Sequence, residues 1–117
     1  MSGLVSYLSG LSAEQSVTMH YEARGCRTEC QRWRGRHGEI DLITRDGADL
    51  VFVEVKKSKD FLRAAERVTR AQVQRIQATI FEFLEAQPNG QLTPFRFDVA
   101  LVNAKGEMQI IENALAY

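Results

Sequence analysis

The chain has 117 residues, a length that fits one domain with a single hydrophobic core and leaves little room for a second. Hydrophobic residues make up 44% and charged residues 26%, as in soluble globular proteins, and no apolar run approaches the roughly 20 residues that span a membrane. The formal net charge is zero, which argues against a strongly basic nucleic-acid-binding protein. We therefore expect one cytoplasmic domain over residues 1–117, with no signal peptide and no membrane contact.

The first predicted element is a helix. A capping-box pattern at residues 12–15 predicts that it runs over residues 12–24, with Val17 and Tyr21 facing the core. Before it, residues 4–8 would form either an extra helical turn or a loose arm, and residues 1–10 as a whole could be a flexible or dimerising arm.

Two cysteines, Cys26 and Cys30, follow this helix. A structural zinc site usually needs four Cys or His ligands, and the two histidines of the chain, His20 and His37, would have to complete it. Their spacing matches no familiar zinc module, so we favour two reduced, partly buried thiols.

Three strands are predicted next. Residues 26–34 form a weak candidate, and residues 39–43 a better one. The turn-forming residues 45–49 then lead into a largely apolar strand over residues 50–56. We expect the second and third of these strands to pair as a hairpin.

The second half of the chain predicts a long helix over residues 64–86, which a Pro-Asn-Gly sequence ends. A strand over residues 95–102 and a short terminal strand over residues 108–111 follow. The expected fold class is α/β, a mixed sheet flanked by helices in the order α-β-β-β-α-β.

Charge is distributed unevenly along the chain. Residues 24–75 contain 13 Lys and Arg against 8 Asp and Glu, whereas the remainder contains 2 against 7. A basic middle segment around an acidic pocket suits a phosphate backbone, although a solvated charged face explains the same distribution.

The chemistry of the chain is concentrated in this middle segment. Alternate strand residues share a face, so Asp41 should point away from the face of Ile40 and Leu42. On the partner strand Glu54 and Lys56 share a face. If the hairpin register joins the two polar sets, Asp41, Glu54 and Lys56 line one cleft.

Carboxylates on a mostly apolar sheet are costly unless something compensates for their desolvation. Mg²⁺ (or Mn²⁺) would do so, with ligands from Asp41, Glu54 and the backbone carbonyl of Val55. Such a metal polarises a scissile phosphate and lowers the pKa of a bound water, and Lys56 would hold that water or stabilise the developing charge. The alternative is a strand lysine that forms ion pairs with the neighbouring acids.

Three segments carry a resemblance to a known family: Gly38-Glu39-Ile40-Asp41-Leu42-Ile43, Val51-Phe52-Val53-Glu54-Val55-Lys56 and Arg96-Phe97-Asp98-Val99. In order and spacing they resemble the PD-(D/E)XK nuclease superfamily, and more closely the YraN-like family of small bacterial proteins. The resemblance covers nearly the whole chain from about residue 10. It implies the restriction-endonuclease-like core fold and places three residues at the catalytic motif positions, Asp41, Glu54 and Lys56.

The resemblance extends to two helical positions. Glu14 corresponds to a site-directed glutamate of the family's first helix, although it follows Ala13 where the family has glycine. Gln72 stands where the family usually has a lysine that reaches phosphate or water, so it would act by hydrogen bonding. The family also tends to have an asparagine where this chain has residues 32–34, Arg-Trp-Arg.

Other polar residues have open assignments. For Glu39 three interpretations stay open: it supports Asp41 from beside the metal site, it binds a second metal, or it forms a surface ion pair with Arg36. Asp98 is interpreted as a strand residue paired with Arg96, and His37 as an exposed loop residue that could touch phosphate. The predicted nucleic-acid-binding residues are Arg34, Arg36, Lys57, Arg70 and Arg75.

The leading hypothesis is a metal-dependent endonuclease that hydrolyses DNA phosphodiester bonds, on branched or damaged DNA by analogy with relatives of the fold. Cleavage of a junction would favour a homodimer. The alternatives are a non-catalytic nucleic-acid-binding or scaffold domain that kept the fold, and an interaction module that dimerises through its N-terminal arm.

Overall fold

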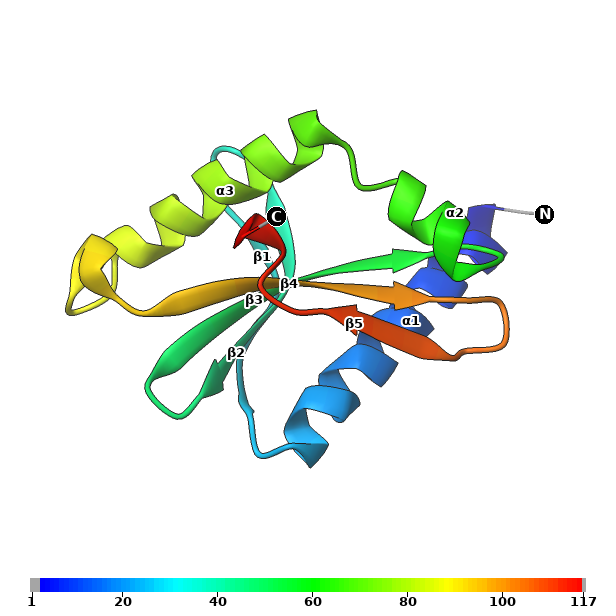
Figure 1. The fold of residues 1–117 in the computed structure, drawn as a ribbon, viewed down its shortest axis with the longest axis horizontal. Coiled ribbons are helices and arrows are strands. Elements are labelled where there is room, and N and C mark those ends of the chain that lie inside the picture. Colours follow the sequence, from blue (N-terminus) through cyan, green and yellow to red (C-terminus); the bar gives the residue numbers. More distant parts are fainter. Residues whose placement is uncertain (1–2, 117) are drawn as a thin grey trace.

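The computed structural model describes the backbone of residues 3–116 and the side chains of residues 10–115. In this part of the chain a five-stranded sheet lies between helices on its two faces (Figure 1). The elements follow in the order α1 (Gly3–Ala23), β1 (Arg27–Arg34), β2 (Glu39–Asp46), β3 (Asp49–Lys57), α2 (Phe61–Glu66), α3 (Arg70–Glu85), η1 (Gly90–Leu92), β4 (Phe95–Val102), β5 (Met108–Ile111) and η2 (Ala114–Ala116).

The strands lie in the order β1-β2-β3-β4-β5, the same as their order in the chain. Neighbours are antiparallel except β3 and β4, which are parallel and are joined by the crossover through α2 and α3. This confirms the predicted α/β class, with a mixed sheet and helices on both faces. No helix in the described part of the chain is long and apolar enough to cross a membrane.

The predicted hairpin is confirmed. β2 and β3 pair from Leu42↔Val53 to Asp46↔Asp49, which leaves a two-residue turn of Gly47 and Ala48. Gly47 has a φ of 62°, a conformation that glycine adopts without steric cost and that matches the twist of a hairpin.

The core has two parts, one on each face of the sheet. Between the sheet and α2–α3 lie, among others, Ile40, Ile43, Phe52, Ile76, Ile80, Leu84 and Phe97. Between the sheet and α1 lie, among others, Val17, Tyr21, Leu42, Val51, Val53 and Ala100. The predicted inward positions of α1, Val17 and Tyr21, are therefore confirmed. Burial on both faces accounts for the nearly continuous apolar sequence of β3.

The predicted start of the first helix is wrong. α1 begins at Gly3, so residues 12–15 lie in its interior instead of capping it. The preceding residues contain no proline, and Gly10 within a helix costs only about 1 kcal/mol, so the helix continues through this segment. Residues 3–10 of the predicted arm are thus helical, while Met1 and Ser2 lie outside the described residues.

The predicted long helix over residues 64–86 is also wrong as a single element, because α2 ends at Glu66 and α3 begins at Arg70. The hydroxyl of Thr69 accepts a hydrogen bond from the backbone N–H of Gln72 at 3.2 Å and so caps α3. Threonine in this role favours a helix start over a helix interior, which explains the break.

Candidate functional site

The site begins with a break in strand alternation at Asp41. Ile40 packs against α3 whereas Leu42 packs against α1, so the prediction that these two residues share a face is wrong. Opposite Asp41 on β1 lies Arg32, whose φ of 54° is rare for a non-glycine residue. At this position Oδ2 of Asp41 accepts a hydrogen bond from the backbone N–H of Val55 on β3 at 2.8 Å.

Glu54 lies beside this aspartate on β3, one position beyond the last paired residues of β2 and β3. It is only 7% exposed. Its Oε2 accepts hydrogen bonds from Nζ of Lys56 at 3.1 Å and from Nε2 of Gln72 at 3.0 Å. The structure therefore brings together the predicted residues Asp41, Glu54, Lys56 and Gln72, with the first three supplied by the hairpin and the last by α3.

Three carboxyl groups, those of Glu14, Asp41 and Glu54, lie close together here. Burial raises the pKa of Glu54 to about 8, with a hydrogen bond to Asp41 and the charge of Asp41 acting in the same direction and Lys56 opposing them. Burial also raises the pKa of Glu14 to about 7, assisted by the charge of Asp41 and a hydrogen bond to it and opposed by Arg32. Glu14, predicted from the family resemblance, is thus part of the cluster.

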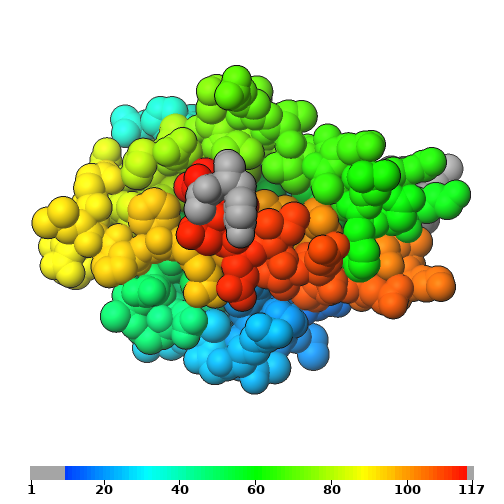
Figure 2. All heavy atoms as spheres, viewed as in Figure 1, coloured from blue at the N-terminus to red at the C-terminus, as the bar shows by residue number. Residues whose placement is uncertain are grey.

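These groups line a groove with a volume of about 810 Å³. Its walls come from α1, the end of β3, the break between α2 and α3, and the turn between β4 and β5. The lining residues are Gly10, Ala13, Glu14, Asp41, Glu54, Val55, Lys56, Lys57, Ser58, Lys59, Arg67 and Ala104. Figure 2 shows α2 and the β4–β5 turn side by side at one end of the molecule, where the backbone N–H of Ala104 donates to the carbonyl of Lys59.

A second, smaller hollow of about 250 Å³ lies between α3 and β2. It also contains Asp41 and Glu54, together with the predicted residues Glu39, Gln72 and Arg75. Asp41 and Glu54 therefore line both the larger groove and the smaller hollow.

The predicted ion pair of Glu39 with Arg36 is wrong. Glu39 contacts Arg34 at 3.1 Å and Arg32 at 3.6 Å, whereas Arg36 contacts Glu82 at 3.2 Å. The backbone N–H of Arg36 also donates to both oxygens of Glu82, so the β1–β2 loop is fixed on α3 and its arginine points away from Glu39.

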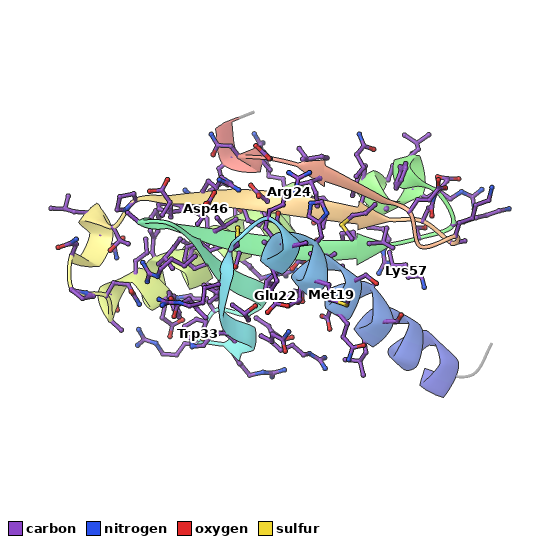
Figure 3. All side chains as sticks on the ribbon, turned by 90° about the horizontal axis from the view of Figure 1, so that it is seen from below. Met19, Glu22, Arg24, Trp33, Asp46 and Lys57 are labelled. Carbon is purple, nitrogen blue, oxygen red and sulfur yellow. The ribbon has the colours of Figure 1, made fainter. Side chains whose placement is uncertain are left out.

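The other predicted nucleic-acid-binding residues are spread over the molecule. Lys57 lies at the end of β3 near α1 and lines the larger groove (Figure 3). Arg75 lines the smaller hollow. Arg70 is exposed at the start of α3, and the side chain of Arg34 is 80% exposed beside Glu39.

Sequence reasoning missed two basic residues of the larger groove, Lys59 and Arg67. Nη1 of Arg67 donates to the backbone carbonyl of Lys57 at 2.7 Å. The predicted unbroken helix concealed Arg67, because only the break after α2 places it over the strand end. For Lys59, the run of basic residues at 56–59 was the available signal.

Asp98 is fully buried on β4, and its predicted ion pair with Arg96 is confirmed at 3.2 Å. The structure adds two further donors: the hydroxyl of Tyr21 at 2.7 Å and the backbone N–H of Asn113 at 3.0 Å. Burial, followed by the hydrogen bond and charge of Asp98, raises the pKa of Tyr21. These contacts join α1, β4 and the C-terminal segment, away from the groove.

The described residues contain no group of three or more His, Cys, Asp or Glu side chains arranged to hold a metal ion. Cys26 and Cys30 are free thiols, as favoured from the sequence, and pack on opposite faces of the sheet. Mg²⁺ needs fewer protein ligands than such a group provides, because it binds through one or two carboxylates and keeps several waters. N–H donors contact Oδ2 of Asp41 and Oε2 of Glu54, and the carboxylate pair beside the Val55 backbone fits such an ion once both acids are deprotonated.

The sequence is similar to those of a family of bacterial proteins. Residues 13–102 match the family described as "Uncharacterised protein family UPF0102". A UPF0102 protein of Ruegeria pomeroyi is 53% identical over 115 residues, which cover 98% of this chain and 94% of that protein. Another from Roseobacter denitrificans is 56% identical, covering 98% and 89%, and one from Cereibacter sphaeroides is 53% identical, covering 99% of each chain. The chain therefore belongs to the UPF0102 family, as its resemblance to the YraN-like small bacterial proteins predicted.

Proposed function

We propose that this protein is a metal-dependent endonuclease of the PD-(D/E)XK type that hydrolyses DNA phosphodiester bonds. The observation that carries the proposal is the position of Asp41 and Glu54. Both carboxyls line the larger groove, and Lys56 contacts the more buried of them, Glu54, at 3.1 Å. A buried acid with a raised pKa in a groove, as Glu54 is, is typical of catalytic sites.

Each residue of the site has a defined role in this proposal. Asp41, Glu54 and the carbonyl of Val55 would hold Mg²⁺ or Mn²⁺, which when bound polarises a phosphate and acidifies a water. Lys56 would orient the attacking water and balance the charge that develops on the phosphate. Gln72 would keep the Glu54 carboxylate in position through its hydrogen bond at 3.0 Å.

The remaining acids have supporting roles. Glu14 shares a hydrogen bond with Asp41 and would bind a water of the metal, or the metal itself, once deprotonated. Glu39 lines the smaller hollow and holds Arg32 and Arg34 through ion pairs. It would therefore act through these arginines and not as a ligand.

Of the basic residues predicted from the sequence, Lys57 and Arg75 line the two hollows beside the carboxylates and would contact the DNA nearest the site. Arg34, Arg36 and Arg70 lie outside the larger groove and would contact it farther away. We propose branched or damaged DNA as the substrate, in analogy with other nucleases of this fold class. A homodimer would place two such sites for paired cuts in the two strands of a branched substrate.

Metal binding is the first test. Isothermal titration with Mg²⁺ or Mn²⁺ should give binding to the wild-type protein and at least tenfold weaker binding to Asp41→Asn, which keeps the shape of the side chain but removes its charge. Asp46→Asn, on the same strand and 52% exposed, is the matched control and should bind like wild type. Absence of metal binding by the wild-type protein would exclude this mechanism.

Cleavage is the second test, over linear, nicked, flapped and four-way DNA. Glu54→Gln and Lys56→Ala should each lower the rate by a factor on the order of 10²–10³, because each removes a group that acts on the reacting phosphate or its metal. Activity that survives in both variants would come from another site or a contaminant.

The same assays identify the alternative, a binding domain that kept the fold. It is favoured by Gln72, a neutral residue where the resemblance implies a lysine. Its signature would be retention on DNA without cleavage, with affinity that falls as salt rises.

A further inference from the structure

The two walls of the larger groove differ in charge. On one side lie the carboxyls of Glu14, Asp41 and Glu54. The other side follows the end of β3 and the break after α2, and it carries Lys57, Lys59 and Arg67. Lys56 stands between the two sides and is paired with Glu54 at 3.1 Å.

The basic wall is held in place by the fold. The backbone N–H of Ser58 donates to the carbonyl of Val102 at 3.0 Å, and the carbonyl of Lys59 accepts the N–H of Ala104 at 3.3 Å. Arg67 is held at its guanidinium by the carbonyl of Lys57 at 2.7 Å. These bonds join the wall to the β4–β5 turn, so a bound anion would order little additional backbone.

The charges of two residues on this wall, Lys59 and Arg67, are available to a ligand. In the described part of the chain, neither Lys59 nor Arg67 lies within ion-pair distance of a carboxylate, whereas Arg63 on the same helix faces Asp60. The contact with Lys57 uses one of the five N–H donors of the Arg67 guanidinium, and the rest suit a phosphate.

The composition of the groove also indicates which part of a nucleic acid it contacts. Among the described residues, its lining includes no aromatic side chain, the group on which bases stack. The described lining residues are mostly charged or small. This composition suits the phosphate backbone of a nucleic acid more than its bases.

We propose that Lys57, Lys59 and Arg67 form a subsite for the phosphodiester next to the one held over Asp41 and Glu54. This inference rests on the proposed function, since it takes a nucleic-acid strand as the ligand. The strand continues from the carboxylate pair along the end of β3 toward α2, and its bases are not read in this segment.

Binding without metal tests the subsite separately from catalysis. Fluorescence anisotropy with labelled oligothymidylate and oligodeoxyadenylate of equal length, in the presence of a chelator, gives Kd over a series of salt concentrations. Lys59→Gln/Arg67→Gln should bind both oligonucleotides roughly tenfold more weakly than wild type, and the slope of log K against log salt should fall by about 1.4, or about 0.7 for each lost contact.

The matched control is Arg63→Gln/Lys105→Gln, which removes two exposed positive charges outside the groove. It should bind like wild type. Unchanged affinity and slope in the groove variant would overturn the subsite, as would a preference above tenfold for one base sequence. Equal loss in both double variants would also overturn it, because the effect would then be one of net charge.

A neutral linkage tests the position of the subsite. In a cleaved oligonucleotide, a single methylphosphonate next to the cut linkage, on the subsite side, should slow wild-type cleavage roughly tenfold and leave the slower cleavage by Lys59→Gln/Arg67→Gln unchanged. Equal slowing of both proteins would overturn the assignment. If the double variants bind as expected but the wild-type protein cleaves no DNA, the nuclease proposal is refuted and the phosphate subsite is still supported.

Discussion

Two buried carboxylates lie on neighbouring parallel strands, and their surroundings differ. Asp98 on β4 is fully buried and accepts hydrogen bonds from Tyr21, Arg96 and Asn113. Glu54 on β3 is 7% exposed, lines a groove together with a second acid, Asp41, and has a pKa that burial and Asp41 raise.

The charge of Asp98 stabilises the fold, whereas the charge of Glu54 is unfavourable in its surroundings. Donors on three segments compensate the burial of Asp98, so its charge holds those segments together. The charge of Glu54 is opposed by burial and by Asp41, whereas Lys56 and Gln72 favour it, as a bound cation would. The two residues should therefore respond in opposite ways to mutation.

The largest expected effect on stability is that of Asp98→Asn. Three donors converge on the two oxygens of Asp98, and an amide would replace one acceptor with a further donor, so we expect a loss of about 3 kcal/mol in the free energy of unfolding. Urea denaturation measures it. Asp46→Asn, which affects the exposed partner of Arg96, should cost less than about 0.5 kcal/mol. Similar costs for the two variants would contradict a structural role for Asp98.

Tyr21→Phe should cost about 2 kcal/mol, because it removes a buried 2.7 Å hydrogen bond to a charged acceptor. Nucleic-acid cleavage per folded molecule should not change, since the tyrosine lies outside the groove. Thermal unfolding and the cleavage assay on the same preparation measure both quantities. A variant with full stability but reduced activity would mean that this network belongs to the site.

Stability should depend on pH through Glu14 and Glu54. Their pKa values rise from the ordinary 4.5 to about 7 and about 8 in the folded protein, so the folded state keeps protons that the unfolded state has lost. The stability that these protons provide is fully present below about pH 4.5 and is lost as the pH rises to about 8.

Urea denaturation of the metal-free protein across this pH range should show the decline, and Glu14→Gln/Glu54→Gln should flatten it. Addition of Mg²⁺ near pH 8 should restore stability to the wild type and not to the double variant. A decline of equal steepness in both proteins would assign the pH dependence to other groups.

The smallest expected effect is that of Gln72→Ala, which removes one hydrogen bond from Glu54 and should slow cleavage about tenfold with little loss of stability. Gln74→Ala, an exposed position on the same helix, is the control and should behave as wild type. If both variants cleave at the wild-type rate, Gln72 has no positioning role.

Elements with local signals were predictable from the sequence alone. The alternation and turn residues around Gly47 predicted the hairpin, and the apolar composition of residues 50–56 predicted a largely buried strand. Both predictions are confirmed, because a tight turn and a two-residue repeat are encoded within a few neighbouring positions. Two short motifs in that hairpin also predicted that Asp41, Glu54 and Lys56 line one cleft, and all three line the larger groove.

The other features of the site depend on contacts between segments that are far apart in the sequence. The two-residue alternation of β2 breaks at Asp41, where β1 has the unusual backbone of Arg32. The sequence pattern alone therefore could not indicate that Asp41 accepts the backbone N–H of Val55. Arg67 lines the groove because a threonine cap interrupts a helical pattern that reads as continuous. Asp98 and Tyr21 are 77 positions apart, and only the packing of α1 against the sheet brings them together. Long-range packing selects among conformations that local sequence permits.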